Sequence, residues 1–185
     1  MKKNIILFIT LAIVFSGTAL RAQKQAELPP KIKWITYKEA TEKNKGVEKR
    51  KILTDVFTAW CGWCTRMDAT TFADADVVDY VNKYFWAVKL DAEMKEPVVI
   101  DSVTYVNQRP NANRSTHELA FKLLQGQLSY PSYVISNEEN QIITIVPGYF
   151  NKENFMIILR YFNENIYLTK PFAQYKAESA QVPIK

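Results

Sequence analysis

TDVFTAWCGWCTRM, residues 54–67, is the stretch on which the fold prediction rests. It contains both cysteines of the chain, Cys61 and Cys64, at the point where an apolar strand passes into a helix. At a helix N-terminus the first sulfur lies beside unpaired backbone N–H groups and the positive end of the helix dipole, which favour the thiolate. The second sulfur lies one turn further along, where it can close a short disulfide on the first. The spacing therefore predicts a redox-active dithiol that exchanges disulfides with other proteins.

Two other uses of a cysteine pair conflict with the rest of the sequence. A structural zinc site needs about four Cys or His ligands, whereas this chain offers the two cysteines and His117. Attachment of a c-type haem needs a histidine directly after the second cysteine, where this chain has Thr65. A purely structural disulfide stays open, although so short a loop restricts the unfolded chain little. We therefore expect no metal ion and no other cofactor.

The same stretch resembles the active-site region of the thioredoxin superfamily. The pattern of that family is an apolar strand with a buried acid, then a Trp before the first cysteine and a Gly after it. Asp55, Trp60 and Gly62 occupy these places. The resemblance implies that Asp55, six residues before Cys61, helps to take the proton from the resolving cysteine, Cys64.

Three further positions match this family at its usual spacing. They are Lys89 in the strand 87–91, near the buried acid; Tyr130-Pro131 in a cis-proline turn facing the dithiol; and Gly148, which closes the last strand. The resemblance covers residues 51–162. It implies an α/β thioredoxin-like fold with a central mixed sheet flanked by helices, and an inserted hairpin and helix before the cis-proline turn.

The N-terminus has the pattern of a secretory signal peptide over residues 1–22. Two lysines precede an apolar run over residues 5–15, which is too short to span a bilayer comfortably, and small residues follow it. Cleavage after Ala19 or after Ala22 fits the small-residue rule, and we favour Ala22. We expect no stable membrane insertion after cleavage, and an uncleaved anchor is the alternative.

Export determines both the compartment and the charge of the mature chain. A periplasmic or otherwise exported protein meets an oxidising environment, in which disulfides form and need management. The chain carries a net charge of +5. Removal of residues 1–22, with their three basic side chains, leaves 21 basic and 19 acidic side chains, a net charge of +2. The basicity belongs partly to the targeting signal, so we expect no nucleic-acid partner.

The chain is long and apolar enough for one compact domain, with 185 residues of which 48% are hydrophobic. We predict a linker over residues 23–30, a thioredoxin-like domain over 31–165 with an insert at about 92–114, and a loosely ordered tail over 166–185. The expected strands are 31–35, 52–59, 85–90, 98–100, 103–106, 132–136 and 141–146, and the expected helices are 36–44, 61–67, 75–83, 115–124 and 151–162.

Two features near the middle of the chain have open roles. The insert at 92–114 either covers the sheet edge or recognises a partner. Residues 115–118 predict a capping box at the start of a helix, which would leave His117 exposed and outside the mechanism.

The predicted reaction is the reduction of disulfides in exported client proteins. Cys61 attacks the client disulfide, and Cys64, deprotonated with help from Asp55, releases the reduced client. A membrane or periplasmic electron donor then restores the dithiol. Strongly reducing thioredoxins usually carry Gly-Pro between their cysteines, whereas this chain carries Gly62-Trp63. The N–H that replaces the proline ring should stabilise the thiolate and make the pair less reducing.

Retention of Asp55 favours reduction over oxidation, because a buried base is most useful when the resolving thiol must be activated. A disulfide oxidase or isomerase and a non-catalytic thioredoxin-like binding module remain the alternatives.

Residues around the dithiol are predicted to contact the client or to tune the thiolate. The client-binding set is Trp60, Gly62, Trp63, Tyr130 and Pro131. Tyr130 either contacts the client strand or packs against Trp60. Lys89 and Arg66 are candidates for electrostatic support of the thiolate.

Overall fold

The computed structural model describes residues 30–179 of the 185-residue chain. The predicted signal peptide (residues 1–22) and all but the last residue of the predicted linker lie outside this part. Among the described helices, none combines the length and the apolar character that crossing a bilayer requires.

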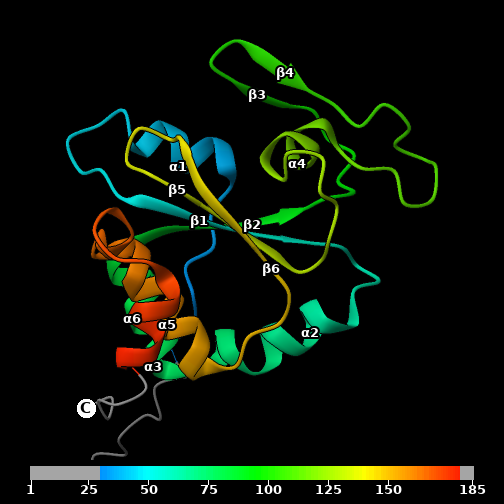
Figure 1. The fold of residues 1–185 in the computed structure, drawn as a ribbon. Helices are drawn as coiled ribbons and strands as arrows, with labels where there is room; N and C mark the ends of the chain where they lie inside the picture. The colour runs from blue at the N-terminus through cyan, green and yellow to red at the C-terminus, as the bar shows by residue number, and fades with distance from the viewer. Residues whose placement is uncertain (1–29, 180–185) are drawn as a thin grey trace, which may run out of the picture.

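The centre of the molecule is a four-stranded mixed sheet with the strand order β2-β1-β5-β6 (Figure 1). Strand β1 (Lys51–Phe57) pairs in parallel with β2 (Phe85–Asp91) and antiparallel with β5 (Ser132–Ser136). Strand β6 (Ile142–Pro147) lies antiparallel to β5. Because β1 has neighbours on both sides, its end, where the dithiol follows, is held by two strands.

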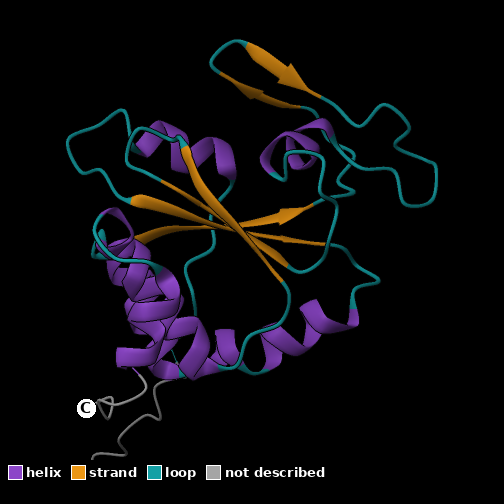
Figure 2. Ribbon diagram, in the orientation of Figure 1, coloured by secondary structure: helices purple, strands orange, loops and turns teal. Residues whose placement is uncertain are grey.

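Helices cover both faces of the sheet (Figure 2). The helices α1 (Tyr37–Lys43) and α4 (Glu118–Leu123) lie on one face. The other face carries α2 (Gly62–Ala69), the 3-10 turn η1 (Thr71–Ala73), α3 (Ala75–Tyr84) and α5 (Lys152–Asn163). This arrangement confirms the predicted mixed sheet flanked by helices, with an inserted hairpin and helix before the turn at Pro131.

The alternation of side chains along β1 decides which face receives the buried acid. Leu53 belongs to the apolar core beneath α2, α3 and α5, whereas Ile52 and Val56 belong to the core beneath α1 and α4. Successive side chains of a strand point to opposite faces. Asp55 therefore shares the face of Leu53, on the side of the sheet where α2 lies.

The insert forms a separate hairpin of β3 (Val98–Ile100) and β4 (Val103–Tyr105). Within the described chain these strands pair with each other and not with the main sheet. The partly buried side chains of the hairpin pack against the core beneath α1 and α4. Ile35 forms an isolated parallel bridge with Val88 of the edge strand β2. This bridge is the part of the predicted strand 31–35 that pairs in the structure.

His117 is buried, so the expectation that it is exposed is wrong. Its Nδ1 accepts a hydrogen bond of 3.1 Å from the N–H of Leu119, which makes His117 the N-cap of α4. The predicted capping box does not form, because the Ser115 hydroxyl donates to Asn107 in the insert. Burial lowers the pKa of His117, which favours the neutral ring that this cap needs.

The C-terminal segment differs from the loosely ordered tail that the composition predicts. After a 3-10 turn, η2 (Ile166–Leu168), the chain forms α6 (Phe172–Ser179). Tyr161 of α5 packs against Phe172 and Tyr175 at ring distances of 5.1 and 5.4 Å, and its hydroxyl donates to the carbonyl of Lys170 at 2.6 Å. These contacts attach residues 170–179 to α5, and residues 180–185 lie outside the described part.

Candidate active site

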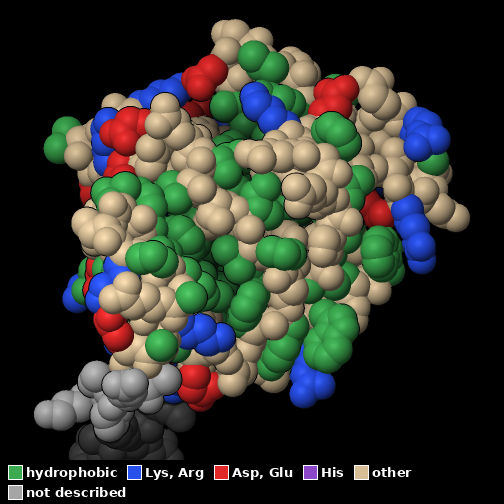
Figure 3. Space-filling view, viewed as in Figure 1, with side chains coloured by type: hydrophobic (Ala, Val, Ile, Leu, Met, Phe, Trp, Pro, Cys, Tyr) green, Lys and Arg blue, Asp and Glu red, His purple; other side chains and the backbone are tan. Residues whose placement is uncertain are grey.

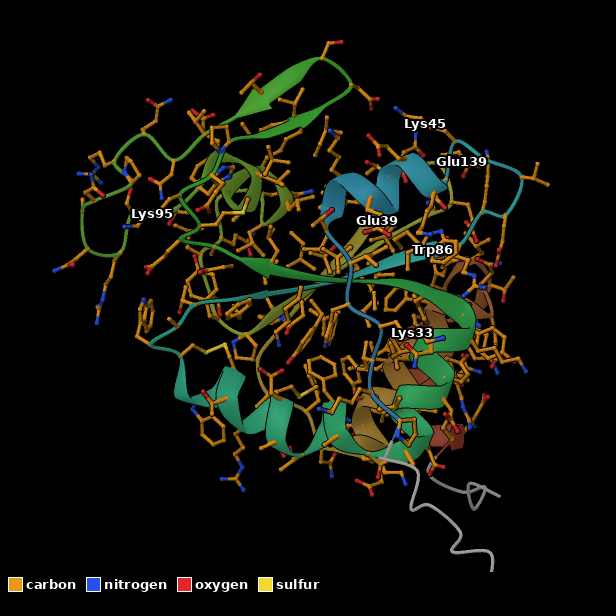
Figure 4. The ribbon with its side chains drawn as sticks, turned by 180° about the vertical axis from the view of Figure 1, so that it is seen from behind. Lys33, Glu39, Lys45, Trp86, Lys95 and Glu139 are labelled. Atoms are coloured by element: carbon orange, nitrogen blue, oxygen red, sulfur yellow. A yellow bond between two sulfur atoms is a disulfide. The ribbon has the colours of Figure 1, made fainter. Side chains whose placement is uncertain are left out.

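The two cysteines form a disulfide at the start of α2, with their Cα atoms 5.3 Å apart (Figure 4). Cys61 is the N-cap of the helix, and the backbone N–H of Cys64 donates to its Sγ at 3.1 Å. A sulfur in this place accepts one of the N–H groups that a helix leaves unpaired at its start. The same N–H can stabilise the Cys61 thiolate after reduction of the pair.

Asp55 is buried and has one paired and one unpaired carboxylate oxygen. Its Oδ2 accepts a hydrogen bond of 2.6 Å from Nζ of Lys89, whereas its Oδ1 is buried without a partner among the described residues. Burial raises the pKa of this carboxyl to about 6, although Lys89 acts in the opposite direction. Asp55 can therefore take up a proton near neutral pH, and Oδ1 is the oxygen left free for it.

Lys89 reaches Asp55 from the neighbouring strand, because the two residues are partners in the β1–β2 register. Its Nζ also pairs with Asp68 of α2. Asp68 follows Cys64 by four residues, so it lies one helical turn along the same side of α2. The Asp55 ion pair is thereby joined to the helix that carries the dithiol, and the charge of Lys89 is shared by two carboxylates.

Two exposed tryptophans flank the disulfide, with 52% of Trp60 and 56% of Trp63 accessible to solvent. Figure 3 shows hydrophobic side chains gathered over the end of the molecule where α2 begins, with basic side chains beside them. The cysteines themselves are largely covered. An incoming disulfide would therefore meet this aromatic surface first.

Trp60 has three polar or aromatic contacts. Its indole N–H donates to Glu93 at 3.0 Å, and the guanidinium of Arg114 lies 4.7 Å from the ring centroid. Tyr130 packs edge-to-face on Trp60 at 5.9 Å. The packing role foreseen for Tyr130 is thus present in the structure, and its contact with a client remains a prediction.

Trp63 lies beside Tyr149, with ring centroids 5.4 Å apart, and Arg66 covers both rings at 5.5 Å. Arg66 is therefore engaged with aromatic faces rather than with an acid. Lys89, the other candidate for electrostatic support, donates its two hydrogen bonds to carboxylates and none to a sulfur.

The turn before β5 contains a cis peptide bond between Tyr130 and Pro131. The N–H of Gly148 donates to the carbonyl of Pro131 at 2.8 Å, which ties the end of β6 to this turn. Gly148 has a φ of 102°, which side-chain-bearing residues adopt only with strain. This conformation explains the glycine at the position that resembles the family pattern.

The sequence analysis did not foresee the residues that contact the two tryptophans, Glu93, Arg114 and Tyr149, or two residues near Asp55, Asp68 and Tyr133. Tyr133 lies opposite Asp55 in the β1–β5 register, and its hydroxyl is buried without a partner among the described residues. The spacing of four residues from Cys64 is the sequence signal for Asp68. It has meaning only once the register of Asp55 and Lys89 is known. Tyr133 offers no such signal, because an aromatic residue in a strand ordinarily indicates core packing.

The fold and the site together define a thioredoxin-fold protein with a Cys-x-x-Cys disulfide, the arrangement of thiol–disulfide oxidoreductases. The chain belongs to the family described as Thioredox_DsbH, protein of unknown function, DUF255, whose pattern matches residues 19–166. A comparison with curated proteins gave no match.

Several solved structures share the fold. A thioredoxin-fold protein from Helicobacter pylori is 15% identical with a TM-score of 0.54, over 77% of this chain and 93% of that chain. A protein named DsbH Oxidoreductase is 15% identical with a TM-score of 0.53, over 77% and 92% of the two chains. A putative disulphide-isomerase from Bacteroides thetaiotaomicron is 18% identical with a TM-score of 0.52, over 78% and 99%. At these identities the likeness establishes the fold alone.

Proposed function

We propose that this protein is an exported oxidoreductase that reduces disulfides in client proteins through Cys61 and Cys64. The observation that carries the proposal is the position of the pair at the start of α2, on the side of the sheet where Asp55 keeps an unpaired buried oxygen. Residues 1–22, which have the pattern of a signal peptide, support export. One structural neighbour, DsbH Oxidoreductase, bears a name that fits the same class of reaction.

The reaction begins with the reduced pair. The Cys61 thiolate attacks one sulfur of the client disulfide, a mixed disulfide forms, and the other client sulfur leaves as a thiolate that takes a proton from solvent. Cys64 then gives its proton to Asp55 and attacks Cys61, which releases the second client sulfur as a thiolate that also takes a proton from solvent. Two electrons pass to the client, and the Cys61–Cys64 disulfide of the structure is the product state.

Regeneration requires a donor of two electrons outside the cytosol, which we infer to be a membrane or periplasmic thiol donor. The donor attacks the disulfide and leaves the pair reduced. The donor should attack the sulfur of Cys61, because Cys61 is slightly more exposed than Cys64. Cys61 is therefore the sulfur through which both the client and the donor form their mixed disulfides.

Cysteine variants test the proposal directly. Cys61→Ser should abolish disulfide reduction, whereas Cys64→Ser should form mixed disulfides with exported proteins that accumulate, because the releasing thiol is absent. The matched control is the Cys61→Ser, Cys64→Ser double variant, which should trap nothing. A Cys64→Ser variant that captures no exported protein would contradict client reduction.

The equilibrium reduction potential of the pair, measured against glutathione, tests the direction. A reductase should have a potential in the range of glutaredoxins and thioredoxins, about −200 to −270 mV. A potential near −120 mV, the range of strong oxidants, would instead support the oxidase alternative. A Cys61–Cys64 pair that exchanges with neither reduced nor oxidised glutathione would support the binding-module alternative.

A further inference from the structure

Asp55, Lys89 and Asp68 form a cluster of two carboxylates and one ammonium group, which we call the Asp-Lys-Asp cluster. Lys89 donates to Oδ2 of Asp55 at 2.6 Å and also pairs with Oδ1 of Asp68. The exposed fractions of the side chains rise along the cluster, from 2% for Asp55 to 20% for Lys89 and 47% for Asp68. Lys89 thus joins a buried acid to one that water reaches.

The outer end of the cluster opens into a surface pocket of about 430 Å³. Asp68 and Lys89 line this pocket together with Lys31, Trp34 and Phe72. Neither the cysteines nor the aromatic residues flanking them belong to its lining. The cluster therefore meets solvent at a place distinct from the surface that a client disulfide approaches.

Aromatic rings fix the position of the Lys89 ammonium group. The ring centroids of Trp34, Phe57 and Phe72 lie 5.1, 5.0 and 5.4 Å from Nζ. Such faces attract a cation without accepting its proton. Lys89 is therefore held as a cation between the two acids, and the carboxylates are the groups that must divide its charge.

The groups that face Asp55 come from three elements. Strand β2 supplies Lys89, helix α2 supplies Asp68, and strand β5 supplies the buried hydroxyl of Tyr133. Lys89 is the one cation among them. Burial and the Asp68 charge both raise the pKa of Asp55, and Lys89 lowers it.

Charge balance shows what the second acid does. With both carboxylates ionised, the cluster has a net negative charge in a largely buried place, and one proton makes it neutral. A lone ammonium beside Asp55 would already balance that carboxylate and keep it from accepting a proton. Asp68 takes part of the ammonium charge, and because it is the more exposed acid it tolerates ionisation better.

We propose that Asp68 is a positioning residue, which shares Lys89 with Asp55 and so keeps Asp55 able to accept the proton of Cys64. This inference rests on the proposed function, since it assigns Asp68 to the release step of client reduction. In that step the Cys64 S–H bond breaks and its proton passes to Asp55. The electron pair left on sulfur forms the bond to Cys61, and the client thiolate departs. Lys89 stays with Asp68 as Asp55 loses its charge.

The first experiment follows the Asp55 carboxyl by NMR as the pH of the oxidised protein is changed. In Asp68→Asn, which keeps the shape and removes the charge, Lys89 serves Asp55 alone. The midpoint of the Asp55 titration should fall by about 1 pH unit. Asp68→Glu should restore most of the midpoint, because it returns the charge. Asp79→Asn, which removes an exposed acid on α3, should leave the midpoint unchanged.

The second experiment measures release of a peptide from a preformed mixed disulfide with Cys61, in a single turnover at several pH values. Asp68→Asn should slow release about tenfold at pH 7 and move its pH dependence to lower pH, as expected for a weaker base. Asp79→Asn should release the peptide at the wild-type rate.

The two experiments separate the possible failures. An Asp55 midpoint that does not move in Asp68→Asn would overturn the role of Asp68, even in an active reductase. A wild-type protein that reduces no disulfide would overturn the proposed function, whatever the titration shows. A merely structural role of Asp68 would lower stability in Asp68→Asn and Asp68→Glu alike while leaving the Asp55 midpoint in place, and that outcome also counts against the inference.

Discussion

Asp55 is costly to keep in its ionised form, because it is buried and one of its oxygens has no partner among the described residues. An unfolded aspartate titrates near pH 4, whereas burial raises the pKa of Asp55 to about 6 in the folded protein. Between these values the folded state binds more protons than the unfolded state, so the stability contributed by Asp55 falls as the pH rises. A difference of about 2 pH units corresponds to about 3 kcal/mol.

Asp55→Asn should therefore make the oxidised protein more stable than the wild type above pH 7, by about 1 to 3 kcal/mol, and the gain should vanish near pH 4. The lower end of the range allows for the ion pair with Lys89 that is lost. Urea unfolding at a series of pH values measures the difference. The same variant should slow release from the mixed disulfide, since Cys64 loses its base. A variant less stable than the wild type at pH 8 would contradict the unfavourable burial of this charge.

Two variants distinguish the effect of the Trp63 backbone N–H on the reduction potential from the effect of its ring. Trp63→Pro removes the backbone N–H of residue 63 and should lower the reduction potential of the pair by about 30 mV, equivalent to about 1.4 kcal/mol. Trp63→Ala removes the contacts with Tyr149 and Arg66 but keeps the N–H, so its potential should stay near that of the wild type. Glutathione equilibria of both variants provide the measurement, and equal changes would assign the tuning to the ring instead.

At the scale of elements, the periodicity of apolar residues predicted most of the helices and strands of the central fold. The apolar periods placed β1, β2, β5, α3 and α5 within a few residues of their observed bounds. The expected helix 36–44 is observed as α1, which Thr36 caps by accepting from the N–H of Glu39. The predictions that differ concern contacts between distant residues. Whether His117 is buried depends on how the insert folds over α4, and that packing leaves no periodic pattern.

The chemistry of the site divides in the same way. One short stretch of chain contains Cys61, Cys64 and Asp55, so these residues could be identified from their spacing in the sequence. Asp68 joins them only through Lys89, and that link requires the register of β1 with β2 and the side of the sheet on which α2 lies. A single sequence shows neither the strand register nor the side of the sheet on which a helix packs.

Helix α6 gives a test of such a distant contact. Phe172→Ala should destabilise the protein by about 1 to 2 kcal/mol, because the ring is partly buried against Tyr161 of α5. Lys176→Ala, on the exposed side of α6, should change stability by less than about 0.5 kcal/mol. Thermal unfolding of the two variants measures the contrast. Equal effects would mean that α6 does not pack on α5 in solution.

At the scale of the whole molecule, the reduction potential and the stability of the fold are linked. The folded and unfolded chains, each oxidised or reduced, form a closed thermodynamic cycle. A folded pair that is more reducing than the same pair in the unfolded chain must therefore stabilise the fold when it is oxidised. For a two-electron couple, about 30 mV of potential difference corresponds to about 1.4 kcal/mol of stability difference.

The proposed reductase should consequently unfold at a higher urea concentration when the Cys61–Cys64 disulfide is intact than when it is reduced. The physical reason lies in the site. Reduction replaces an uncharged disulfide, which crosslinks the start of α2, with a Cys61 thiolate that is largely covered by the folded protein. The double variant with serine at both positions should unfold identically under oxidising and reducing conditions, which controls for the reagents. A reduced form more stable than the oxidised one would reverse the sign of the cycle, and the protein would then deliver disulfides to its clients instead of removing them.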